Sequence, residues 1–167
     1  MKHLKLVVLV AFLAIGLGAN AQKVAHINTD KLLSEMPQTK ALKAELQRLE
    51  KTYKNDIEAM AKKLQAKMTK YQKEGATQSQ EINEKRAMEV QQEGARIQKA
   101  RQEAAVAMQK KYQEKTMPIL QKAEKAIKEV ASEKGIIYVL DASPGKGLIV
   151  YDKGEDLYNA VKAKLGF

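Results

Sequence analysis

Histidine and cysteine, the residues that most often hold transition metals or carry catalysis, are almost absent from this chain of 167 residues. It has no cysteine and two histidines, His3 and His26. His3 lies in a segment that we expect to be removed, and His26 lies on a predicted strand, where packing or surface exposure explains it. Zinc and copper sites need clustered imidazole and thiolate ligands. We therefore predict no metal and no cofactor.

A glycine-rich stretch, Pro144-Gly145-Lys146-Gly147, has part of the composition of a phosphate-binding loop. It lacks the first glycine, the Ser or Thr after the lysine, and the following helix, so we interpret it as a turn. The glutamates follow a solvated helical pattern without an apolar pocket that would raise a carboxyl pKa for acid-base chemistry. We predict that the protein is not an enzyme.

The first 21 residues have the features of a secretory signal peptide. Lys2 and Lys5 frame the start of an uncharged apolar run that ends at Leu17, and Ala19-Asn20-Ala21 supplies small residues for cleavage after Ala21. The run is short for a membrane span and no second run follows, so we expect a mature chain that is soluble outside the cytoplasm. An uncleaved anchor is the alternative. The absence of cysteine excludes disulfides and a lipid-modified cysteine.

Most of the positive charge lies in one long segment. The net charge of +10 becomes +8 without the signal, and the stretches 38–74 and 79–116 together contribute +7 of it. Such an excess favours acidic partners, namely nucleic acid, anionic lipid or an acidic unfolded chain. Export argues against nucleic acid.

That segment has the pattern of a helical hairpin. Residues 38–133 carry almost no breakers apart from one cluster, at 75–79, and the apolar positions on its two sides mirror each other around Thr77. Pairing each position i with 154 − i sets several apolar or aromatic residues opposite one another: Leu42 and Tyr112, Leu46 and Met108, Leu49 and Ala105, Ile57 and Ile97, Leu64 and Val90. We expect Gly75 to end the first helix and Thr77 to form a capping box with Gln80.

Three residues are candidate hinges. Pro37 and Pro118 fall almost opposite each other in this register, and proline kinks or ends a helix. Gly94 lies inside the second arm, opposite Met60, and costs about 1 kcal/mol of helix stability against alanine. We expect the two arms to change direction together at the prolines and the second arm to flex at Gly94.

The segments flanking the hairpin predict a small body. Strands are expected at 24–27, 136–140 and 148–151, a short helix capped by Thr29 reaches Met36, and a last helix spans 152–165. Three short strands are too few to close a core alone, so association through the body is expected, with a splayed monomer as the alternative. We predict a mostly helical α+β fold: a body of residues 22–36 and 117–167 and a hairpin arm of residues 37–116.

Lysines gather near the tip of the first arm. They are Lys62, Lys63, Lys67, Lys70 and Lys73, and the glutamates Glu81, Glu84, Glu89 and Glu93 lie on the other arm. The two rows could complement the helix dipoles and pair across the hairpin. The other interpretation is a basic grip on cargo or lipid.

In order along the chain, these features resemble the Skp/OmpH family of periplasmic chaperones. The matching stretches are the opening strand at 23–28, the charged hairpin, Met117-Pro118-Ile119-Leu120 with Ala126-Ile127, Tyr138-Val139-Leu140-Asp141 and Asp156-Leu157-Tyr158. The family often has Asp-Ile-Thr where this chain has Asp156-Leu157-Tyr158, a difference that bears on the local helix cap.

The resemblance implies a periplasmic homotrimer whose strands build a shared body and whose arms enclose unfolded outer-membrane proteins without ATP. Flexible, polarizable side chains suit such clients. Candidate client contacts are Met60, Met68, Tyr71 and Met88 with Lys62, Lys63, Lys67, Lys70, Lys73 and Lys99. Met60 and Ile82 could instead close the helix seam. The other functions that we consider are an envelope spacer that binds one folded partner and a basic protein that binds anionic lipid or lipopolysaccharide.

Overall fold

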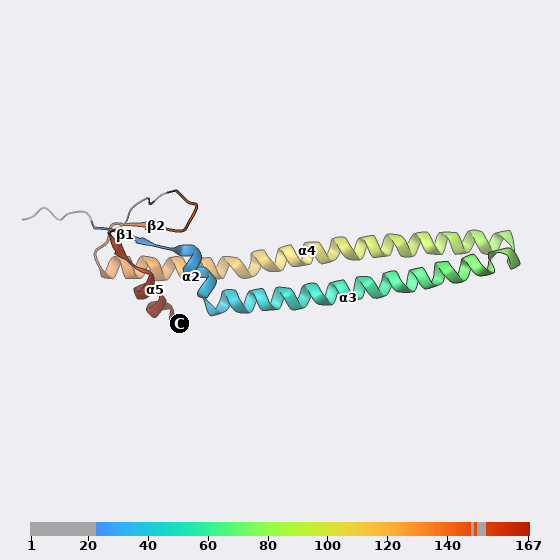
Figure 1. The fold of residues 1–167 in the computed structure, drawn as a ribbon, viewed down its shortest axis with the longest axis horizontal. Helices are drawn as coiled ribbons and strands as arrows, with labels where there is room; N and C mark the ends of the chain where they lie inside the picture. The colour runs from blue at the N-terminus through green and yellow to red at the C-terminus, as the bar shows by residue number, and fades with distance from the viewer. Residues whose placement is uncertain (1–22, 148, 150–152) are drawn as a thin grey trace, which may run out of the picture. The chain divides into compact units, whose positions relative to one another are not determined.

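The computed structural model of this protein describes residues 23–147, 149 and 153–167. Two long helices dominate it, and three short strands form one sheet (Figure 1). The elements are β1 (Val24–Ile27), α2 (Thr29–Glu35), α3 (Pro37–Glu74), the 3-10 turn η2 (Gly75–Thr77), α4 (Gln80–Glu133), β2 (Tyr138–Asp141), β3 (Glu155–Asp156) and α5 (Tyr158–Leu165). The predicted α+β class is confirmed, and the predicted signal peptide lies outside the described residues.

The chain divides into two compact units. One unit is residues 34–121, with α3, η2 and most of α4. The other unit combines the described residues before Ser34 with Lys122–Phe167, and it contains the sheet, the end of α4 and α5. Each unit is described separately below.

The sheet is parallel throughout, in the order β2-β1-β3. Val24 pairs with Tyr138 and Ala25 with Glu155. Alternation along β1 buries Ala25 and Ile27, each 1% exposed, and leaves Val24 44% exposed, as expected for a strand with one packed face. The strand predicted at 24–27 is confirmed, and the strand predicted at 136–140 is present at 138–141.

The third strand differs from the prediction. Most of the strand expected at 148–151 lies outside the described residues, and the second neighbour of β1 is Glu155–Asp156, which we had placed in the last helix. That helix begins only at Tyr158. The carboxylate of Asp156 accepts a hydrogen bond of 2.8 Å from the backbone N–H of Tyr158, so this acid ends the strand and satisfies an N–H of the first helical turn.

Helix ends in the sheet unit follow local chemistry. Gly135 has a φ of 66°, and the N–H of Ile136 bonds back to the carbonyl of Ala131, so α4 ends at the predicted glycine with a left-handed cap. At the start of α2 the prediction was wrong by one residue. The Asn28 side chain accepts a bond of 2.8 Å from the N–H of Lys31 and caps the helix, whereas Thr29 is its first residue.

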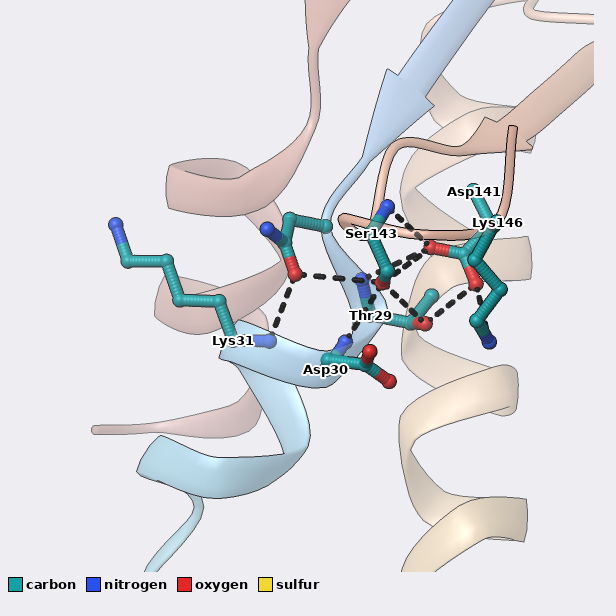
Figure 2. A network of polar contacts seen from close by, with 7 residues as sticks. Thr29, Asp30, Lys31, Asp141, Ser143 and Lys146 are labelled. Carbon is teal, nitrogen blue, oxygen red and sulfur yellow. Dashed lines mark hydrogen bonds and ion pairs between the residues drawn. The ribbon is translucent and has the colours of Figure 1, made fainter. Parts of the chain in front are cut away.

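A polar network ties the start of α2 to the loop after β2 (Figure 2). Asp141 accepts hydrogen bonds from Thr29 Oγ1 at 2.8 Å and from Ser143 Oγ at 2.6 Å. Ser143, 4% exposed, also accepts a bond of 3.0 Å from the N–H of Asp30. Lys146 Nζ lies 3.1 Å from the Asp141 carboxylate. The network joins residues more than a hundred positions apart in sequence and so holds the start of α2 against the loop after β2.

The second long helix does not end at proline. α4 runs from Gln80 to Glu133 with Pro118 inside it, so this proline does not end the helix. Proline removes one hydrogen bond from the ladder, and the helix continues on either side of that gap. A change of direction at Pro118 stays a prediction.

Candidate functional site

The helical unit is built on a narrow apolar seam between α3 and α4, which lie side by side (Figure 1). Leu42, Ile97 and Ala104 are its most buried members, at 7–8% exposure. Tyr53, Ile57, Met60 and Leu64 are only half-buried. Two helices alone cannot enclose a side chain on all sides, so most of the surface of this unit remains open to solvent.

The seam is polar toward the tip. Lys67, 27% exposed in its side chain, donates to Glu89 at 2.7 Å and to Glu93. The Tyr71 hydroxyl donates to the other oxygen of Glu89 at 2.6 Å. We call Lys67, Tyr71, Glu89 and Glu93 the seam cluster. It joins the two helices where apolar contacts are sparse.

The hydrogen bonds of the seam cluster shift its pKa values in opposite directions. The bonds to Glu89 and Glu93 raise the pKa of the Lys67 ammonium, and the bond to Glu89 raises the pKa of the Tyr71 phenol. The bonds from Lys67 and Tyr71 lower the pKa of the Glu89 carboxyl. Each shift favours the protonation state present at neutral pH.

The tip is closed by side-chain bonds that differ from the predicted capping box. Arg86 pairs with Glu74 at 2.6 Å, and its guanidinium lies 4.5 Å from the centre of the Tyr71 ring. The Thr77 hydroxyl donates back to the carbonyl of Glu74, and Ser79 Oγ accepts from the N–H of Ile82. Ser79 therefore caps α4, and the capping box of Thr77 with Gln80 is wrong.

Gly75 also departs from the prediction. It has right-handed angles, φ −56° and ψ −37°, so it continues the first helix into η2 and does not end it with a left-handed cap. The chain reverses only at Gln78 and Ser79.

This late reversal shifts the register of the hairpin. The side chains that bond across it have residue numbers that sum to 156–160 and not to 154, as in Lys111 with Glu45 and Arg86 with Glu74. Two proposed seam positions are consequently wrong. Tyr112 is 55% exposed while Lys111 faces the other helix, and Ala104 is buried while Ala105 is exposed.

The lysine row near the tip divides into two groups. Lys67 pairs across the hairpin with glutamates of the predicted opposing row, and Lys70 lies 4.0 Å from Glu74 on its own helix. Lys62, Lys63 and Lys73 are exposed and have no ion pair with any residue that the structure describes. Those three remain available to an anionic partner. Lys99 is 75% exposed and lies 3.7 Å from Glu103, one turn away.

The apolar candidates are exposed to different degrees. Met88 is 56% exposed and Met68 is 43% exposed, whereas Met60 and Tyr71 are half-buried. Ile82, which we had considered for the seam, is 42% exposed.

Two open hollows lie along the hairpin. A hollow of about 280 Å³ is lined by Met60, Lys63, Lys67, Glu93, Arg96 and Ile97. A second, of about 360 Å³, is lined by Met68, Tyr71, Gln72, Asn83, Arg86, Ala87 and Val90. Each combines apolar side chains with basic ones, so each could receive an apolar side chain whose neighbours are acidic. Gly94 follows Glu93 directly but is not among the lining residues of either hollow, and a Cβ built there meets nothing within 4 Å.

Three exposed apolar residues of α4 were missed as candidate contacts: Val106, Met117 and Leu120, at 64%, 55% and 40% exposure. The mirror pattern does not indicate these residues, because it concerns only side chains that face the other arm. Their signal in the sequence is spacing, since Val106 follows Met88 by eighteen residues, or five helical turns.

The residues first considered for chemistry have structural roles. His26 is half-buried on β1, and Lys146 lies in a turn, where it pairs with Asp141. Among the described residues, no group of three or more Asp, Glu, His or Cys side chains is arranged to hold a metal ion. None of the helices in that part of the chain combines the length and apolar character that a membrane crossing needs.

Comparison with known proteins gives consistent relatives. Two proteins named "Chaperone protein Skp" align over 78% of this chain and 80% of their own length: that of Yersinia enterocolitica at 25% identity and that of Photorhabdus laumondii at 27%. The Skp chaperone of Vibrio cholerae is 24% identical over 95% of both chains.

The fold is also found in a solved structure. The crystal structure of an OmpH-like outer membrane chaperone from Caulobacter crescentus superposes with a TM-score of 0.78 over 89% of this chain and 86% of the other, at 17% identity. The family model "Outer membrane protein (OmpH-like)" matches residues 23–165, which is nearly the whole described chain. This protein therefore belongs to the OmpH-like family, whose relatives named above are chaperones.

Proposed function

We propose that this protein is an ATP-independent periplasmic holdase that binds unfolded outer-membrane proteins between basic helical arms and prevents their aggregation. In this proposal residues 37–116 form the arm, residues 22–36 with 117–167 form the body, and residues 1–21 direct export. The observation that carries it is the set of isolated, exposed apolar side chains on an otherwise polar hairpin, Met68 and Met88 among them.

The spacing of these side chains suits a chaperone that must release its client. Each methionine offers a flexible, polarizable contact worth little by itself. A continuous apolar patch would hold the client too tightly or aggregate the chaperone, because large exposed patches associate with each other. Weak contacts spread along a polar helix bind many unfolded chains with similar strength.

The charge of the arms supports the same function. Lys62, Lys63 and Lys73 are exposed to solvent and contribute to the net positive charge of the hairpin. Long-range attraction speeds the capture of acidic chains and weakens as salt is added. The same lysines favour a second candidate function, the binding of anionic lipid or lipopolysaccharide.

Association through the body forms part of the proposal. One face of the sheet leaves Val24, Tyr138 and Leu140 exposed at 44%, 57% and 41%, and neighbouring Ile137 at 58%. A parallel sheet is normally covered on both faces. Further copies of this chain would cover the open face, and we propose a homotrimer.

The test is an aggregation assay. A denatured outer-membrane β-barrel is diluted into low-salt buffer with and without the purified mature protein, in the absence of ATP, and light scattering is recorded. We expect suppression at a trimer-to-client ratio near one, and weaker suppression at high salt. Undiminished aggregation at every ratio would refute the holdase. Flotation with vesicles of anionic lipid tests the second candidate function, lipid binding. An envelope spacer would instead bind one folded partner.

A further inference from the structure

Four apolar side chains on α4 form a row that faces away from α3. At about 100° per residue, Val106 lies on the same side of the helix as Met88, Met117 lies about 20° from that line, and Leu120 about 40° to its other side. The buried seam residue Ile97 is nine positions before Val106, about 180° around the helix. We call Met88, Val106, Met117 and Leu120 the outer strip. All four are at least 40% exposed.

Glutamine is the main residue type beside the outer strip. Gln92, Gln102, Gln109 and Gln113 lie within about 60° of its line, and all four are exposed. A primary amide both donates and accepts hydrogen bonds. The backbone of an unfolded chain carries one donor and one acceptor at almost every residue, whatever its sequence. Glutamines around single apolar side chains therefore match an extended polypeptide of any sequence.

The spacing does not fit other occupants. A partner helix needs apolar residues every three or four positions, but between Met88 and Val106 this face presents Ala95, Lys99 and Gln102. A folded partner needs anchors gathered at the centre of a patch. Here Met88 and Val106 are about 27 Å apart along the helix, and Val106 and Met117 are about 16 Å apart. A membrane surface needs a continuous apolar face.

We propose that the outer strip is a docking track for extended segments of unfolded polypeptide. This inference rests on the proposed chaperone function and assigns its client contacts to a face of α4 that is separate from the seam. The strip extends over residues 88–120, a rise of about 48 Å along the helix, which equals about fifteen residues of extended chain at about 3.3 Å each. Its apolar side chains take the client's apolar side chains, and the glutamines bond to the client's backbone.

A pair of matched double variants tests the track. Val106→Gln with Met117→Gln removes two anchors, and Ile82→Gln with Tyr112→Gln removes two apolar residues of 42% and 55% exposure that lie about 120° from the strip. Affinity for a labelled, unfolded β-barrel is measured by fluorescence anisotropy. We expect the strip variant to bind about tenfold more weakly, and the control variant to stay within about twofold of the wild type.

The outcomes separate this inference from the proposed function. If the wild type binds and the strip variant binds equally well, or if both variants lose affinity equally, the track is wrong and the chaperone function stands. If the wild type binds no unfolded chain, both fail. Glutamine is a good helix former, and circular dichroism checks the fold of each variant. If a variant unfolds, photocrosslinking of the wild-type fold replaces the affinity measurement. A photocrosslinker is placed at Gln109 or, as the control, at the exposed Gln65 of α3. Stronger client crosslinking from Gln109 supports the track, and equal or weaker crosslinking from Gln109 overturns it.

Discussion

Single residues set the strength of the seam near the tip, and Glu89 is one of them because it bonds to both Lys67 and Tyr71. We predict that Glu89→Gln lowers the pKa of the Tyr71 phenol toward its ordinary value near 10, because the carboxylate that accepts the hydrogen bond of the phenol is gone. The pKa is measured by NMR of ring-labelled tyrosine. Glu103→Gln is the control, since Glu103 pairs with Lys99 on its own helix and takes no part in the seam cluster. An unchanged pKa in Glu89→Gln would show that the bond is absent in solution.

The pKa shifts also predict the pH range of the seam cluster. Glu89 has a lowered pKa, so its contribution to stability is present above about pH 4.5 and is lost as the pH falls through the folded value. Lys67 and Tyr71 have raised values, so their contributions are present below about pH 10 and are lost above it. Protection factors of the amides near the tip, measured by hydrogen exchange and corrected for the intrinsic pH dependence of the exchange rate, should therefore be highest between these limits.

Asp141 is the carboxylate of the polar network in the sheet unit, and its role there is similar to that of Glu89 in the seam cluster. Burial alone would raise the pKa of its carboxyl, but hydrogen bonds from Ser143, Thr29 and Lys146 lower it well below the ordinary range. Asp141→Asn should reduce the free energy of unfolding by about 1–3 kcal/mol at pH 7. The stabilisation is present above about pH 4 and is lost as the pH falls through the lowered value, so the difference from wild type should shrink in acid.

Urea unfolding at pH 7 and pH 3 measures this difference. Asp30→Asn provides the control, because Asp30 joins the network through its backbone N–H and not through its carboxylate. Equal stability of Asp141→Asn and wild type at pH 7 would show that the network is not stabilising.

At the scale of whole elements, the long helices were predictable and their register was not. The helices follow from a long run without breakers, which needs no tertiary information. Register depends on where the chain reverses, and Gly75, which the sequence predicts to end the first helix, instead continues it into η2. The third strand was missed because Glu155 and Asp156 have little strand propensity and pair only in the presence of β1.

The candidate site shows the same division. Exposed Met88 and the charge of the arms could be read from residue type, because both depend on composition and helical period. The position of Lys67 in the seam and the exposure of Tyr112 could not, because each depends on a register shift of a few residues.

Gly94 tests whether α4 needs a weak point. A Cβ at this position meets nothing within 4 Å, so Gly94→Ala should raise the free energy of unfolding of the helical unit by about 0.5–1 kcal/mol through helix propensity and lower chain entropy. Ala95→Gly, the adjacent exposed position, should lower it by a similar amount. Chemical denaturation measures both. If Gly94→Ala instead lowers the free energy of unfolding, then a neighbouring group packs against Gly94 in solution, contrary to the open space around it in this structure.

At the scale of the whole molecule, most of the fully buried side chains and the proposed client contacts lie in different units. The sheet unit contains most of the fully buried side chains, such as Leu32, Leu157 and Val161, all at 0% exposure. The helical unit has few buried residues and a largely solvated surface. Proteins with separate stable and adaptable parts can change their binding surface at little cost to folding, because contacts in one part are independent of the other. Substitutions on the hairpin should therefore leave the sheet intact.

The parallel sheet constrains the order in which the chain acquires structure. β1 is the central strand, yet both of its neighbours, β2 and β3, lie more than a hundred residues later in the sequence. β1 therefore has no strand to pair with until the segments after α4 fold back onto it. Contacts within the hairpin are closer in sequence and form sooner. The folding chain is therefore expected to complete its hairpin before its sheet, and its first strand stays unpaired until the last part of the chain reaches it.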